Sequence, residues 1–479
     1  NGIHFYHRYF RELDAGASLE DAVLTSSEHV SKAAFLSCLT TAIGFFALLT
    51  ADMPILRSFG FYLGCGVLMA FVGLSTIIPA ALQLIKPTRY QSQDYQFLAY
   101  IDVMVAYLLQ PLPRFLVIAS GGVFVVIGII VAQSSSYDYY LKDMLDTDHP
   151  QVISAQIADN ELSGAFPMEV SLLGQAGDFK KAEVLRRVLL LQSWLAENGM
   201  GAHALSVAQI VNTLNHTISN EEGFPTTDAA VAQLLLLAEG SSDDILNQLV
   251  NFDYSHARIR LNGTDRGAAS LIDLQSQFER YANELMADTG VRVTMTGEAP
   301  VAYQGMNKLA QELMRSVFVA IIFIVITVLI VFRDIRLAIA SIFPNMLPII
   351  LGLVYYQFSG QSLNPLPGIA FCIAIGIAVD DTVHLFARFN EELSKGKERS
   401  IAIIDAVKEV KGALFSSSLI LTAGFLVFTL SGFSWNRDLG YLGAVLIILA
   451  LISDLIYTPA FLSLTGSKNS HNPPQLQKG

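Results

Sequence analysis

The segment Gly376–His384 reads GIAVDDTVH and places two adjacent carboxyls, Asp380 and Asp381, near the middle of an otherwise apolar stretch. A charged carboxylate in hydrocarbon costs about 3 kcal/mol or more unless it is paired, hydrated or protonated. Such a residue is a functional candidate, and the stretch predicts a membrane helix whose acids load and release protons. The alternative is that one carboxyl only caps or pairs locally.

Spacing suggests partners for these acids. Adjacent residues point about 100° apart on a helix, so the two carboxyls face different neighbours. His384 lies one turn from Asp380 on the same face, where an imidazole can share or relay a proton. Asp454, in the last apolar stretch, is expected at similar depth, with a relay role or a packing role. Thr422 can donate to a carboxylate or serve close helix packing.

Composition indicates a membrane protein. The 479 residues are 52% hydrophobic and 15% charged, with a mean hydropathy of +0.47, whereas soluble domains carry about 25% charged residues. The net charge of -12 is concentrated between residues 137 and 312 and disfavours nucleic acid as a partner. Cys38, Cys65 and Cys372 all lie in apolar stretches, so no disulfide framework is expected.

A membrane span needs about 20 mostly apolar residues. The sequence offers eight: Lys32–Ala51, Leu56–Ile85, Arg114–Gln133, Ser316–Phe332, Leu337–Phe358, Pro367–Phe386, Ala413–Leu430 and Leu439–Leu464. Basic residues are concentrated in alternate connections, which the positive-inside rule places in the cytoplasm. Residues 134–315 must then lie outside the cytoplasm.

That outer region alternates strand-like and helix-like runs. Met168–Leu173, Ala257–Leu261 and Val291–Met295 favour strands, while Lys180–Asn198 and Ser270–Ala287 favour helices. The pattern predicts an α+β domain built from β-α-β units.

The two ends of the chain repeat each other 380 positions apart. Identical residues in register include His4 and His384, Arg8 and Arg388, Gly16 and Gly396, Gly60 and Gly440, and Pro79 and Pro459. Both copies run in the same direction, which indicates a parallel repeat. Asn1 stands opposite Asp381, and His4 opposite His384. We therefore expect the natural protein to continue upstream through the rest of that span, two more spans, another outer domain and a first helix, with an acid just before Asn1.

Two further segments at equivalent repeat positions, Leu13–Val30 and Phe389–Val410, mix charge and apolar residues at helical spacing. They are expected to be amphipathic helices at the cytoplasmic interface, or else solvated connectors. No phosphate loop, zinc-protease motif, nucleophile elbow or Cys-x-x-Cys motif is present in the sequence. We therefore expect a protein that is not an enzyme, with no cofactor, no metal site and no ATP as its energy source.

Gly376–His384, with Arg388, resembles the Gly-x-x-x-Asp-Asp signature of resistance-nodulation-division (RND) permeases, particularly the branch of MMPL-like and hopanoid-type lipid exporters. Thr296–Pro300, TGEAP, looks like the approach to the eighth helix of that branch. In that family twelve spans form two six-helix halves. Each half has an outer domain after its first span, and acids on the fourth and tenth spans carry protons.

The resemblance implies a membrane α-helical bundle of about eight spans, plus the end of another, with one extracytoplasmic porter-like α+β domain. The implied division is 1–85 for the end of the fourth span through the sixth, 86–113 for a cytoplasmic linker, 114–133 for the seventh span, 134–315 for the outer domain, 316–465 for the eighth to twelfth spans, and 466–479 for a cytoplasmic tail. Without the first-half acid, the chain alone is not expected to transport.

The implied function is export of lipid or another hydrophobic molecule, driven by the proton-motive force through proton antiport. The protein would be a multi-pass inner (plasma) membrane protein, and the resemblance leaves room for a homo-oligomer or a periplasmic partner. The Asp380-Asp381 pair differs from the Asp-Tyr pair of the mycolate-exporting relatives, so their substrate does not carry over. Two alternatives stay open: a Sec-associated protein-translocation accessory and a sterol-sensing receptor of the Patched type.

Overall fold

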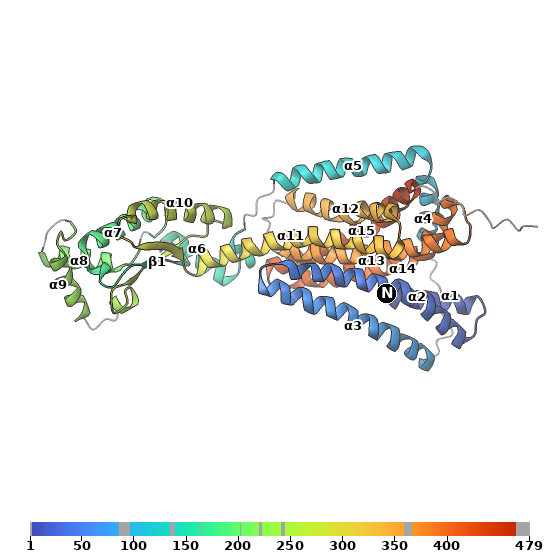
Figure 1. Ribbon diagram of the computed structural model, residues 1–479, viewed down its shortest axis with the longest axis horizontal. Helices are drawn as coiled ribbons and strands as arrows, with labels where there is room; N and C mark the ends of the chain where they lie inside the picture. The colour runs from blue at the N-terminus through green and yellow to red at the C-terminus, as the bar shows by residue number, and fades with distance from the viewer. Residues whose placement is uncertain are drawn as a thin grey trace, which may run out of the picture.

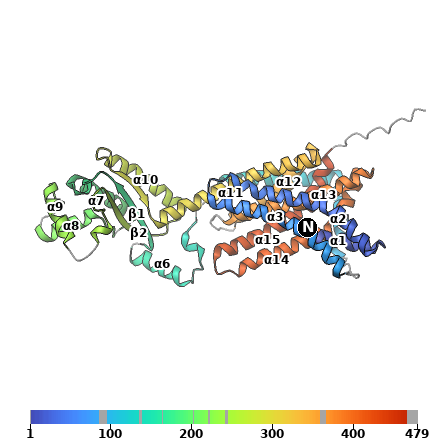
Figure 2. The same ribbon diagram turned by 60° about the horizontal axis from the view of Figure 1, so that its bottom comes forward.

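A computed structural model of the chain describes residues 2–85, 96–134, 139–162, 164–201, 203–219, 223–240, 245–358 and 366–465. The molecule is elongated, with an α+β domain at one end and a bundle of long helices at the other (Figure 1, Figure 2). The predicted fold class, a membrane helical bundle with one α+β domain, is confirmed.

Seven helices within the described ranges are long and apolar enough to cross a membrane. They are α3 (Pro54–Ile85), α5 (Pro111–Ser134), α11 (Glu298–Phe332), α12 (Ile335–Phe358), α13 (Leu366–Ser394), α14 (Arg399–Val427) and α15 (Ser434–Leu464). The other predicted span, Lys32–Ala51, is the apolar end of α2 (Leu19–Phe46) with the short 3-10 helix η1 (Ala47–Thr50). α2 starts with Glu20 and Asp21 behind the Ser18 cap, so only its second part is apolar.

The predicted interfacial helices at Leu13–Val30 and Phe389–Val410 are wrong as separate elements. Each segment contains the end of one long helix, a turn and the start of the next, because helical periodicity continues from the apolar spans into the charged ends. In the first half the helices are α1 (Gly2–Asp14) and α2, and in the second half they are α13 and α14. The region predicted as a linker, 86–113, contains the apolar helix α4 (Gln96–Leu108), while its residues 86–95 and the tail 466–479 lie outside the described residues.

The predicted repeat is confirmed in three dimensions. Gly16 and Gly396 make the corresponding turns with φ of +92° and +79°, a conformation that glycine adopts without strain. η1 and η5 (Phe428–Leu430) follow α2 and α14 at matching positions. A Cβ added at Gly60 would lie 2.5 Å from the carbonyl oxygen of Phe45, and one at Gly440 would lie 2.8 Å from that of Phe425. The two halves therefore use the same close helix contacts.

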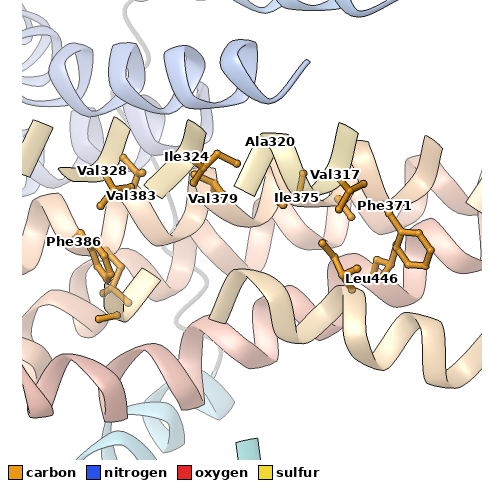
Figure 3. Packing of buried hydrophobic residues seen from close by; sticks show 14 of the residues in the cluster. Val317, Ala320, Ile324, Val328, Phe371, Ile375, Val379, Val383, Phe386 and Leu446 are labelled. Carbon is orange, nitrogen blue, oxygen red and sulfur yellow. The ribbon is translucent and has the colours of Figure 1, made fainter. Parts of the chain in front are cut away.

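α13 lies at the centre of the bundle, in contact with α2, α11, α12, α14 and α15. Figure 3 shows its apolar face against α11 and α15, with the labelled side chains Val317, Ala320, Ile324 and Val328 from α11, Phe371, Ile375, Val379, Val383 and Phe386 from α13, and Leu446 from α15. Because α11 and α13 interlock along several turns, a shift of one helix must be accommodated by the other.

The α+β domain has three strands in the order β2-β1-β3, and β1 pairs antiparallel with both neighbours. Its elements are η2 (Leu141–Met144), α6 (Pro150–Glu161), β1 (Phe166–Leu173), η3 (Asp178–Lys180), α7 (Ala182–Glu197), α8 (Val207–Ser219), α9 (Asp228–Glu239), η4 (Leu246–Gln248), β2 (His256–Gly263), α10 (Ala268–Met286) and β3 (Arg292–Thr296). β2, α10 and β3 form a split β-α-β unit around β1. The connection from β1 to β2 is not a parallel crossover, because η3, α7, α8, α9 and η4 return the chain to the antiparallel edge.

Three contacts attach this domain to the bundle. α11 runs without a break from β3 into the membrane-spanning helices (Figure 1). The ring of Tyr139 in the domain core packs edge-to-face against Trp435 of α15, with ring centroids 6.0 Å apart, and the Arg437 guanidinium at the start of α15 pairs with Asp146. The hydrogen bond from Arg437 lowers the pKa of the Asp146 carboxyl, which keeps this pair charged in mildly acidic surroundings.

At the cytoplasmic end, one carboxylate joins the two halves. Glu409 of α14 pairs with Arg8 at 3.0 Å, and also with Arg11 and Arg388. Arg8 and Arg388 are equivalent residues of the repeat. The side chains of Arg8, Arg388 and Glu409 are each less than one-fifth exposed. Glu409 therefore neutralises cations that both halves bring to the same place.

Replacing Glu409 with Gln is expected to lower the free energy of unfolding by about 2 kcal/mol, because three guanidinium groups lose a shared, partly buried carboxylate. The measurement is the thermal unfolding of the purified protein in detergent. Glu12→Gln is the matched control, since Glu12 pairs with Arg8 alone among these arginines at 2.7 Å. Equal unfolding temperatures for the two variants would contradict a joining role for Glu409.

Candidate functional site

Four helices build one largely buried polar cluster inside the bundle. α13 carries Asp380 and Asp381, α15 carries Asp454, α12 contributes Asn345 and α2 contributes Ser37. α13 is the most enclosed of the seven spans. The two acids predicted on α13 and the one predicted on α15 are thus brought together, although more than 70 positions separate them in sequence.

Asp454 is 2% exposed, and its Oδ1 accepts two hydroxyl groups. Thr382 of α13 donates to it at 2.7 Å, and Thr458 of α15 donates at 3.0 Å. The Thr382 hydroxyl oxygen also lies 3.2 Å from Oδ1 of Asn345. Asp454 is therefore linked to α13 directly and to α12 through Thr382.

The adjacent acids on α13 face different neighbours, as their helical spacing predicts. Asp380 accepts a hydrogen bond from Ser37 on α2 and lies 3.5 Å from Nε2 of His384. Asp381 is 5% exposed and interacts electrostatically with Asp454 and with Asp380. Asp380 is the more accessible acid, because 26% of its side chain is exposed.

Within the described part of the chain, no lysine or arginine forms an ion pair with Asp380, Asp381 or Asp454. The described residues also contain no cluster of His, Cys, Asp and Glu arranged to hold a metal ion. The charge of a buried carboxylate here must therefore be removed by a proton or tolerated at high cost.

The other predicted site residues lie outside this cluster or are not among the side chains that the structure describes. Thr422 is half-buried on α14, and no hydrogen bond among the described residues joins it to the acids, so its relay role stays a prediction. His4 lies on α1, but its side chain is not described, and Asn1 lies outside the described residues.

Four residues of the site were not selected as candidates from the sequence. Thr382 lies inside the acidic motif, and Thr458 lies one turn after Asp454, so both had a spacing signal. Ser37 is the repeat equivalent of Ser417 and gave no signal of its own. Asn345 is a polar residue between two prolines in an apolar span, which is the pattern that could have identified it.

The sequence profile of the MMPL family matches residues 3–93 and 196–478. The chain belongs to the MMPL family. MMPL proteins are transporters, and the predicted RND recognition and the multi-pass inner-membrane location are confirmed with this assignment.

Relatives of this MMPL chain include membrane proteins from bacteria and archaea. A membrane protein of Streptomyces coelicolor, SCO0839, is 31% identical over 31% of this chain and 22% of its own length. MJ1562 of Methanocaldococcus jannaschii is 29% identical over 46% of this chain and 59% of its own. The hopanoid transporter HpnN of Rhodopseudomonas palustris is 30% identical over 21% and 12%. The matched segments thus span less than two-thirds of each of these relatives.

Among solved structures, SecDF in its super-membrane-facing form superposes on 96% of this MMPL chain and 52% of its own, with a TM-score of 0.51 and 14% sequence identity. At that identity the likeness shows a shared fold and nothing about substrate.

Proposed function

We propose that this chain forms part of a proton-driven exporter of lipid or another hydrophobic molecule, with proton antiport through Asp380, Asp381 and Asp454. The observation that carries the proposal is Asp454, an acid 2% exposed inside a bundle of membrane-spanning helices and bonded only to hydroxyl groups among the described residues. A carboxyl in such a place is stable when protonated and costly when charged, so its proton occupancy can change the packing around it.

The geometry suggests an order for the acids. Asp380 is partly accessible and lies beside His384 and Ser37, whereas Asp381 and Asp454 are enclosed. A proton arriving from outside the cytoplasm would reach Asp380 first and then the enclosed acids. Thr382 and Thr458 supply hydroxyls that exchange hydrogen bonds as the carboxyl of Asp454 gains or loses its proton.

The outer domain is positioned to respond. α11 packs along α13 in the bundle and continues into the α+β domain, where it contacts β1 and β3 (Figure 3 shows the apolar contact with α13). A rearrangement of α13 around its acids is therefore transmitted to the outer domain by a continuous helix, which is the mechanical link that export requires.

A hydrophobic substrate is favoured over a polypeptide. HpnN, a relative by sequence, is a hopanoid transporter, whereas SecDF is related only by fold. The partners of this chain would be lipid, protons and the membrane, with a homo-oligomer or a periplasmic protein as an additional partner and no nucleic acid.

The test uses the full-length protein in liposomes that contain a fluorescent hopanoid analogue. Acidifying the side of the α+β domain is expected to speed transfer of the analogue to acceptor vesicles, and a protonophore is expected to abolish that gain. The same assay with a polypeptide substrate distinguishes lipid export from the second candidate function, a Sec-like translocation accessory. If lipid transfer has the same rate with and without the proton gradient, proton-driven export is excluded. If the gradient moves the polypeptide but not the lipid, the accessory function is favoured.

A further inference from the structure

α12 contains two prolines and is anchored beside Asp454. Its two prolines, Pro344 and Pro348, lack backbone N–H groups, so Pro348 leaves the carbonyl of Pro344 without its usual helical donor. Ser453 of α15 donates to that carbonyl oxygen at 2.8 Å. Ser453 directly precedes Asp454, and α12 is therefore attached to α15 at the level of the buried acid.

Asn345 lies between these prolines and is oriented by its own helix. It is 5% exposed, and its Nδ2 donates to the carbonyl oxygen of Ser341 at 2.7 Å. That bond assigns the amide, because exchanging its two ends would turn its oxygen toward another oxygen. Oδ1 of Asn345 consequently points at the hydroxyl of Thr382, 3.2 Å away.

Thr382 has one hydroxyl hydrogen and three acceptors. These are Oδ1 of Asp454 at 2.7 Å, Oδ1 of Asn345 at 3.2 Å and the carbonyl oxygen of Ala378 at 3.1 Å. When Asp454 is charged, the Thr382 hydroxyl hydrogen stays in the shorter, charge-assisted bond to Asp454. Oδ1 of Asn345 then faces the Thr382 oxygen with no hydrogen between the two oxygens. When Asp454 is protonated, its own hydroxyl donates to Thr382, and the Thr382 hydrogen is free for Asn345, because the carbonyl oxygen of Ala378 already accepts a backbone N–H within α13.

We infer that Asn345 is a positioning residue that links the protonation state of Asp454 to the packing of α12. One proton on Asp454 adds one hydrogen bond between α13 and α12, and its loss removes that bond. The inference rests on the proposed function, since it assigns a response to the same proton site.

Among the described residues, the charged groups that act electrostatically on Asp454 come from α13. Asp380 acts on it electrostatically, and Asp381 lies within electrostatic range. α4 also packs against α15 and carries Asp102, but Asp102 is paired with Lys411 of α14 at 2.6 Å. Between residues 337 and 358 of α12, 412 and 427 of α14, and 115 and 134 of α5, the sequence contains no Asp, Glu, Lys, Arg or His. The side of Asp454 that faces Asn345 thus has no competing charge from these helices.

α12 transmits a change to α5, which leads into the outer domain. A Cβ added at Gly121 of α5 would lie 2.3 Å from the ring of Phe343, and one at Gly128 would lie 2.4 Å from the side chain of Ile350. α5 and α12 are therefore closely packed at both glycines. A movement of α12 is therefore passed to α5.

The test measures proton flux and lipid transfer as functions of pH in liposomes that contain the full-length protein. Asn345→Leu roughly keeps the side-chain volume and removes the acceptor that favours protonated Asp454. Half-maximal proton-driven transfer is therefore expected at a proton concentration about five-fold higher, the factor that one hydrogen bond contributes to an equilibrium constant. Proton flux should also continue with less lipid moved per proton. Asn345→Ser, whose hydroxyl can accept from Thr382, is expected to recover part of the loss and covers the case in which the leucine variant fails to fold.

Two comparisons make the test specific. Ser341→Ala removes a hydroxyl one turn away whose bond among the described residues stays within α12, and it is expected to keep the wild-type pH profile. Adding Asn345→Leu to Thr382→Val should change nothing further, because Thr382 is the link. A wild-type pH profile and wild-type coupling in Asn345→Leu would overturn the inference alone, whereas absence of proton-driven transfer in the unmodified protein would overturn the proposed function and the inference with it.

Discussion

Asp454→Asn is expected to abolish gradient-driven lipid export while leaving the protein folded. The amide has nearly the same shape and can still accept the hydroxyls of Thr382 and Thr458, but it cannot take up or release a proton. Because the proposed coupling of proton uptake to helix movement would be lost, export should fall on the order of 100-fold or more. Stability should be unchanged or higher, since a buried acid has been removed. Proton flux and lipid transfer in liposomes, with thermal unfolding in detergent, measure both effects.

The matched control for this variant is Asp273→Asn, the same chemical change on α10 of the outer domain. Asp273 is exposed and accepts a hydrogen bond from Gln277 at 2.8 Å, so export should remain at the wild-type rate. Normal export by Asp454→Asn would remove Asp454 from the mechanism. Loss of export in both variants would instead indicate a general sensitivity to lost negative charge.

The membrane architecture could be predicted because its signals are local. Apolar length identified the spans, and residues such as Gly16, Gly396 and Pro79 carried the repeat because they occupy special backbone positions. Helix ends were less well predicted. Charged residues near Glu20 and Arg399 continue the helical periodicity of the adjoining spans, so the sequence favoured separate interfacial helices where the structure has longer ones.

The candidate site was only partly predictable for a geometric reason. Asp380, Asp381 and Asp454 were identifiable because an acid in an apolar span is costly wherever it points. Thr382 lies inside the acidic motif and Asn345 lies between two prolines, but that the two side chains face each other becomes visible only when α12 and α13 are packed together. The antiparallel pairing of β1 with β2 likewise depends on where α7, α8 and α9 return the chain, which strand patterns do not specify.

Gly297→Ala is expected to weaken the joint between the outer domain and α11 strongly. Gly297 caps α11 with φ of +104° and ψ of -179°, a conformation open to glycine and strained for other residues. An added Cβ would also lie 2.8 Å from the backbone nitrogen of Glu169 and 3.0 Å from Cα of Met168, both in β1. Backbone atoms held in a sheet cannot move away easily, so the free energy of unfolding of the α+β domain should fall by about 3 kcal/mol. Limited proteolysis of the domain and its thermal unfolding measure this loss.

Gly305→Ala gives the opposite expectation on the same helix. A Cβ at Gly305 would meet nothing within 4 Å, and alanine favours a helix over glycine by about 1 kcal/mol, so this variant should be slightly more stable than the unmodified protein. The pair separates the addition of a methyl group from the position where it is added. If Gly297→Ala resisted proteolysis as well as Gly305→Ala does, the close approach of β1 to the start of α11 would not be what holds the outer domain on its helix.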